Sequence, residues 1–201
     1  MHALVIHSPI LVIAIPLLAA FLTPLISRVS EKARDIYLTG IHIYTLGASS
    51  PSLTIPEYYM VPVRIILEVD AMSIFMGIIS VTVSLAAAIY SLSYVKEETG
   101  RDRYYTLLLL LVVGMLGLEF TGDMFNLFVF LEILSISGAA LAAFRTRFAD
   151  ALEGGFKYIV ISAVGALIIL FAIGIFYAQY NLLNIAALAQ VIQYTKLDKI
   201  A

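Results

Sequence analysis

Residues 104–120 read YYTLLLLLVVGMLGLEF, a stretch in which Glu119 is the only charged side chain. A run this apolar is typical of a helix that crosses a bilayer, whose hydrocarbon core of about 30 Å takes roughly 20 residues. The whole chain has the same character: 62% of its 201 residues are hydrophobic, 13% are charged and the mean hydropathy is +1.00. A soluble domain of this size has too little interior to bury so much apolar surface. The sequence therefore predicts an all-α, polytopic integral membrane protein, a bundle of helices in the lipid bilayer.

Composition also excludes several classes of function. The 12 Lys and Arg residues are matched by 14 Asp and Glu residues, so the chain has no basic surface that would bind nucleic acid. It has no cysteine for an iron–sulfur cluster, and its three histidines are scattered rather than spaced as metal ligands. We therefore expect no cofactor and no metal. Any catalytic activity would belong to a larger complex and its redox subunits, not to this chain.

Six segments are long enough to cross the membrane, and they form one membrane domain with a mixed segment at its C-terminal end, 181–201. The segments cover 3–26, 37–55, 71–95, 104–120, 124–144 and 156–178. The second is the most polar, but if it crosses, eight Lys and Arg residues fall on one side of the membrane and three on the other. Cytoplasmic loops carry such an excess of positive charge. This predicts six helices in the cell membrane with both chain ends on the outer side.

Charged residues within these segments are the candidate functional residues, because a charge at membrane depth costs a few kcal/mol. Glu132 lies eight residues after Met124, about 12 Å into its helix. A carboxyl group at that depth either keeps its proton or finds a cation. We interpret it as a titrating group in an ion path; the alternative is a protonated side chain that donates a hydrogen bond between helices.

Lys157 is the only lysine inside a segment, and Glu153 precedes it by four residues, the favourable spacing for a helical ion pair. Because Glu132 and Lys157 belong to consecutive helices, they are candidates for a minimal proton relay. His42, in the second segment, could join it. The alternatives are a Lys157 side chain that reaches to the headgroups, and a His42 that only packs.

Three further acidic residues have simpler interpretations. Asp70 and Asp123 each precede an apolar segment, where an aspartate is typical of a helix N-cap. Glu119 lies at the outer end of its segment, where solvation at the membrane surface would explain it as well as a function would.

Four motifs, in order along the chain, resemble those of a known family. They read VDAMS (69–73), GDMFNLFVFLEI (122–133), EGGFKY (153–158) and NIA (184–186). They are similar to motifs of the antiporter-like, proton-translocating subunits found in Mrp cation/proton antiporters, in the membrane arm of respiratory complex I and in membrane-bound hydrogenases. The D-type Mrp subunit and its hydrogenase counterpart look most similar.

The resemblance implies an N-terminal half of the antiporter-like fold, in which Glu132 matches the family's essential helix-five glutamate and Lys157 its helix-six lysine. It implies ion-pair switching, in which a glutamate–lysine pair opens and closes. Family members have about fourteen helices, so the lysine usually assigned as the glutamate's partner would lie beyond Ala201. The expected partners are other membrane subunits, and the expected ion is the proton, or sodium exchanged for it.

Two alternatives stay open at this point. The chain could be a structural subunit, derived from a truncated antiporter half, that conducts nothing, although a mid-membrane carboxyl group would then have no purpose. It could also be an incomplete copy of a longer chain, since it ends where the next helix is expected.

Overall fold

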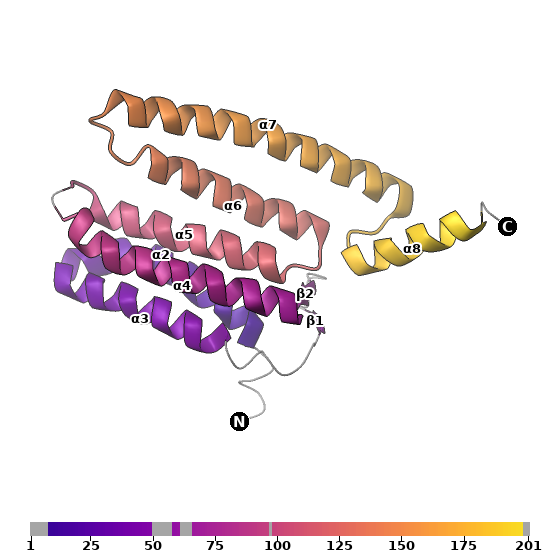
Figure 1. Cartoon of the computed structure of the whole chain (residues 1–201), viewed down its shortest axis with the longest axis horizontal. Helices are drawn as coiled ribbons and strands as arrows, with labels where there is room; N and C mark the ends of the chain where they lie inside the picture. Colours follow the sequence, from indigo (N-terminus) through magenta and orange to yellow (C-terminus); the bar gives the residue numbers. More distant parts are fainter. Residues whose placement is uncertain (1–7, 50–57, 61–65, 97, 199–201) are drawn as a thin grey trace.

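A computed structural model describes residues 8–49, 58–60, 66–96 and 98–198, which form a helical bundle (Figure 1). A short antiparallel pair of strands precedes the helix that begins at Ala71, with Tyr58 opposite Glu68. The elements are α2 (Ser8–Val29), α3 (Glu31–Ser49), β1 (Tyr58–Met60), β2 (Ile66–Glu68), α4 (Ala71–Tyr94), α5 (Arg101–Phe120), α6 (Met124–Ala142), α7 (Ala149–Tyr180) and α8 (Ile185–Asp198).

Helix α5 is the centre of the bundle, because it packs against α2, α4 and α6. It contains the leucine-rich run 107–111, and Leu109, Val113 and Leu116 on it are fully buried. Helix α3 packs on α2 and α4, and α7 packs on α6, so that α5, α6 and α7 form a row (Figure 1). The predicted helical membrane bundle is confirmed.

Ion pairs join the loops at one end of the bundle, which we call the basic end. Arg101, at the start of α5, pairs with Glu31 at the start of α3 (2.9 Å). Glu98, just before α5, pairs with Arg145 (3.2 Å) and with Arg147, both between α6 and α7. The opposite end carries β1 and β2, and we call it the strand end. Helix α3 therefore runs from the basic end back along the bundle.

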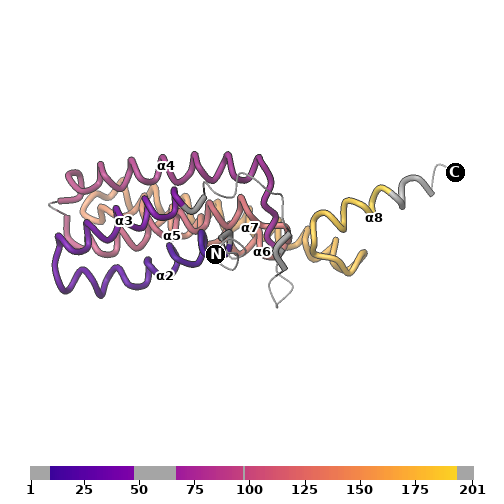
Figure 2. The backbone as a smooth tube through the Cα atoms, turned by 90° about the horizontal axis from the view of Figure 1, so that it is seen from below, coloured from indigo at the N-terminus to yellow at the C-terminus, as the bar shows by residue number. Residues whose placement is uncertain are grey.

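Five of the described helices, α2 and α4 to α7, are long and apolar enough to cross a membrane. Helix α3 is not among them because four of its first five residues are charged. It begins at Glu31 rather than at the expected residue 37, and residues 50–55 of the expected segment lie outside the described residues. Helix α8 occupies the mixed segment and points away from the bundle (Figure 2).

Candidate functional site

Glu132 lies in the middle of α6, between Met124 and Ala142. Asp123 is the N-cap of this helix, and its carboxylate accepts a hydrogen bond from the backbone N–H of Asn126 (2.9 Å). Glu132 itself is half-buried. Within the part of the chain that the structure describes, it has neither a hydrogen bond nor an ion pair.

Close helix packing fixes the position of α6 on both sides. A Cβ atom added to Gly114 of α5 would lie 2.8 Å from the backbone nitrogen of Leu134. A Cβ atom added to Gly155 of α7 would lie 2.5 Å from the Cβ atom of Ala143. Such distances are shorter than a van der Waals contact, so only glycine lets these helices approach so closely.

Lys157 and Glu153 form the expected ion pair one turn apart on α7, between Nζ and Oε1. Both side chains are largely exposed, at 66% and 63%. The contact between Gly155 and Ala143 places Lys157 well towards the basic end, whereas Glu132 lies about three turns before Ala143 on α6. The offset along the helices is therefore on the order of 10 Å. No hydrogen bond or ion pair joins Glu132 to Lys157.

His42 is fully buried between α3 and α4. Its Nδ1 lies 2.8 Å from the carbonyl oxygen of Leu38, and its Nε2 lies 2.9 Å from Oγ of Ser84. Since a carbonyl oxygen can only accept, Nδ1 carries a hydrogen, and in the neutral ring Nε2 accepts one from Ser84. The structure therefore brings His42 to α4 and not to the Glu132 site.

Glu119 is a half-buried acid that the sequence placed at the membrane surface without a specific role. Its side chain turns towards α4, where the hydroxyl of Ser80 donates a hydrogen bond to Oε1. The sequence signal that could have found this contact is a pair of serines, Ser80 and Ser84, one turn apart near the middle of an apolar segment without charged residues.

The two aspartates expected to cap helices do so. Asp70 accepts from the backbone N–H of Ser73 (2.6 Å), and the Ser73 hydroxyl accepts from the backbone N–H of Asp70 (2.9 Å). The hydrogen bonds from Ser73 hold the pKa of the Asp70 carboxyl below its ordinary value. Asp123 caps α6 through the one bond from the backbone N–H of Asn126, so local structure explains both acids.

Two of the motifs meet at the strand end, at a contact we call the strand-end junction. The backbone N–H of Ile185 donates to the carbonyl of Gly122 (3.0 Å), and that of Met124 donates to the carbonyl of Leu183 (2.9 Å). The side chain of Asn184 bridges the two turns, because it donates to the carbonyl of Gly122 (3.1 Å) and accepts from the N–H of Ala187 (2.7 Å). These bonds tie the start of α6 to the turn after α7.

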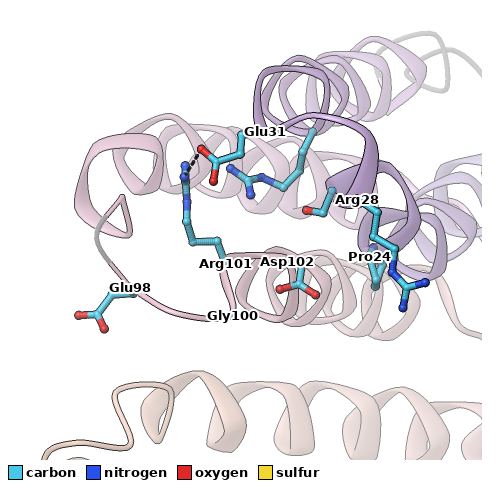
Figure 3. A pocket seen from close by; sticks show the side chains of 9 residues that line it. Pro24, Arg28, Glu31, Glu98, Gly100, Arg101 and Asp102 are labelled. Carbon is cyan, nitrogen blue, oxygen red and sulfur yellow. Dashed lines mark hydrogen bonds and ion pairs between the residues drawn. The ribbon is translucent and has the colours of Figure 1, made fainter.

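A polar cleft of about 390 Å³ lies at the basic end, between the ends of α2, α3 and α5 (Figure 3). Arg101 reaches across it to Glu31. None of the four candidate ion-path residues lines this cleft. Its lining consists of Pro24, Ser27, Arg28, Glu31, Arg34, Glu98, Gly100, Arg101 and Asp102.

Comparisons with known proteins match most of the chain. The family model described as NADH:quinone oxidoreductase/Mrp antiporter, TM, matches residues 121–200, and the model described as NADH-ubiquinone oxidoreductase (complex I), chain 5 N-terminus, matches residues 59–105. NADH-quinone oxidoreductase subunit N of Desulforudis audaxviator is 32% identical over 196 residues, which are 91% of this chain and 39% of that protein.

Two further proteins extend the comparison. The D-type subunit of the Na(+)/H(+) antiporter of Bacillus subtilis is 28% identical, and the match covers 90% of this chain and 38% of that protein. A chain in the structure of membrane-bound sulfane sulfur reductase, an archaeal respiratory membrane complex, superimposes with a TM-score of 0.84 at 30% identity. The match covers 90% of this chain and 39% of that one. This chain thus spans about two fifths of the length of the relatives it matches.

Proposed function

Because the chain belongs to the family of antiporter-like membrane subunits of NADH:quinone oxidoreductases and Mrp antiporters, we propose that it translocates ions as one subunit of a larger membrane complex. The ion is a proton, or sodium exchanged for a proton. The partners are other membrane subunits, as in an Mrp-type antiporter or a redox-driven complex such as a membrane-bound hydrogenase. In this proposal the complex lies in the cell membrane, with both ends of this chain on the outer side.

The observation that carries the proposal is the Glu132 carboxyl group, which lies mid-helix without a partner among the described residues. A carboxylate in this position is costly unless it binds a proton or a cation. Glu132 is therefore the group that takes up and releases the ion. The cation that faces it would come from a helix outside the described residues, because Lys157 is engaged by Glu153 and lies too far along α7.

Lys157 and Glu153 have a second role in the proposal, at the basic-end entrance to the ion path. An exposed pair one turn apart can open when a new charge approaches, since such pairs contribute at most about 1 kcal/mol. His42 is a proposed member of the path through its contact with Ser84 of α4.

The test is proton transport by the intact complex in liposomes, with wild-type Glu132 and with Glu132→Gln. The substitution keeps size and hydrogen bonding but removes titration. We expect transport to be lost while the complex still assembles. The matched control is Glu31→Gln, which removes an exposed carboxylate at the basic end and should leave transport intact. Unchanged transport in an assembled Glu132→Gln complex would instead support a structural, non-conducting subunit.

A further inference from the structure

Glu119 is a carboxyl group held inside the bundle by a single hydrogen bond. Oε1 accepts from the hydroxyl of Ser80 on α4. Oε2 is buried and has no hydrogen-bond partner among the described residues. No ion pair to Glu119 is found in that part of the chain either. A negative charge on Glu119 is therefore stabilised by one hydroxyl only, which makes this group a place where a proton binds.

A second polar pair lies one turn further along α4. Ser84 is buried and contacts Nε2 of His42, on α3, at 2.9 Å. Ser80 therefore connects α4 to α5, and Ser84 connects α4 to α3. The buried Ser91 of the same helix behaves differently, because its hydroxyl donates to the carbonyl of Ala88 within the helix (2.7 Å). The two serines that link helices are thus a distinct feature of α4.

The spacing of the two pairs suits proton transfer. Side chains one turn apart on a helix have Cβ atoms about 5–6 Å apart. A single water molecule spans that distance with two hydrogen bonds of about 2.8 Å each. Ser80 and Ser84 lie near the middle of α4, and Glu119 is the last but one residue of α5. The four groups therefore form a line across α5, α4 and α3 that starts near the strand end of α5.

We propose that Glu119 is a second proton-binding carboxyl group and that Ser80, Ser84 and His42 connect it across α4 into a proton-conducting branch. The inference rests on the proposed transport function but not on Glu132. In one transfer the Glu119 carboxyl gives its proton to the Ser80 hydroxyl, which passes its own to a bridging water. The water passes one to Ser84, and Ser84 passes its own to Nε2 of His42. The balance is one O–H bond lost at Glu119 and one N–H bond gained at His42.

The test uses the intact complex in liposomes with Glu119→Gln and Ser80→Ala, and Ser91→Ala as the matched control. Ser91→Ala removes a buried hydroxyl of the same helix that bonds only its own backbone. We expect Glu119→Gln and Ser80→Ala to lower proton transport by at least about ten-fold, since positioned proton donors contribute rate factors of this size or more. The control should transport at the wild-type rate. Infrared difference spectra should lose one protonated-carboxyl band in Glu119→Gln.

Wild-type transport in assembled Glu119→Gln complex, with no carboxyl band lost, would overturn the proposal. If Glu119→Gln prevents assembly, Ser80→Ala decides alone, because it removes the one described donor and leaves the acid in place. Loss of transport in Glu132→Gln with full transport in both branch variants would refute the branch and leave the proposed function standing. Full transport in Glu132→Gln would refute the proposed role of Glu132 instead, and full transport in all three variants would refute both the branch and the proposed function.

Discussion

The bundle has a covered side, formed by α2 to α5, and an uncovered side, formed by α6 and α7. The two sides differ in the share of their residues that other helices bury. In the apolar stretch of α5, half of the residues are buried, whereas in the corresponding stretches of α6 and α7 only 11% of the residues are buried. The uncovered face of α7 is nevertheless apolar, with Ile161, Leu167 and Phe171 each more than 60% exposed. In a bilayer, lipid and a neighbouring subunit are both apolar, so the residue type does not reveal which of them covers a face.

The two sides differ more clearly in the partners of their ionisable side chains than in their apolar residues. On the covered side, Arg34 and His42 are buried and fully engaged by neighbours. On the uncovered side, Glu132 has no partner among the described residues, and Lys157 has only Glu153. Arg34 and His42 thus find their partners among the described residues, whereas Glu132 does not, and Glu119, with Oε2 buried and unpartnered there, is the exception on the covered side.

The largest expected effect comes from breaking a buried ion pair on the covered side. Arg34 is 3% exposed, donates to Asp35 through Nε (2.9 Å) and Nη2 (2.7 Å), and lies over the ring of Tyr105. Asp35→Ala would leave this guanidinium buried without its carboxylate, which should lower the free energy of unfolding by about 3 kcal/mol. Glu153→Ala, which breaks the exposed pair, should cost less than about 1 kcal/mol.

Denaturation of the detergent-solubilised protein, followed by circular dichroism, would measure both variants. Equal losses of stability in the two would contradict the comparison, because they would mean that the pair on α7 is as buried in the protein as the pair near α5.

A smaller effect is expected within the uncovered side, at Gly155, where α7 packs on α6. Gly155→Ala would force its Cβ atom against Ala143, and overpacking of this kind costs about 1–3 kcal/mol. The neighbouring Gly154→Ala is the matched control, because nothing lies within 4 Å of the added atom. Stability of the two variants, measured in the same detergent, should therefore differ by the packing cost. Identical stability would show that α6 and α7 are not in close contact.

The smallest effect is expected at the N-cap of α4. Asp70→Ala should lower stability by about 1 kcal/mol, since it removes the acceptor for the Ser73 backbone N–H. Because folding lowers the pKa of this carboxyl, its stabilisation is fully present above the ordinary value of 3.8 and is lost as the pH falls through the lowered pKa. Asp70→Asn keeps an acceptor, so it should retain most of the stability and lose this pH dependence. A wild-type protein with no such loss in acid would contradict the assignment.

The helices and their caps could be predicted from the sequence, because they depend on local chemistry. The apolar run 104–120 forms a helix by its own composition, and the aspartates before α4 and α6 cap helices that begin at the next residue. The strand pair, the strand-end junction and the Glu119–Ser80 contact could not be predicted in this way. They join residues far apart in the chain, so they follow only once the packing of the helices is known.

In the candidate site, too, the local contact could be predicted from the sequence and the contact between helices could not. The pair of Glu153 and Lys157 follows from their spacing on one helix, and the structure has it. A direct relay from Glu132 to Lys157 was suggested by the order of the helices, but the register between α6 and α7 separates the two groups. Register depends on the contact at Gly155, which spacing along the chain does not encode.

The glycine contacts on both sides of α6 have a mechanical consequence. With Leu134 seated against Gly114 and Ala143 against Gly155, rotation of α6 about its own axis would drive each of these side chains into a neighbouring backbone. The two contacts therefore prevent α6 from rotating relative to α5 and α7. The face of α6 from which Glu132 projects stays the same. In the proposed transport function, any change in access to that carboxyl would therefore come from its side-chain torsions or from the surfaces around it, and not from rotation of α6.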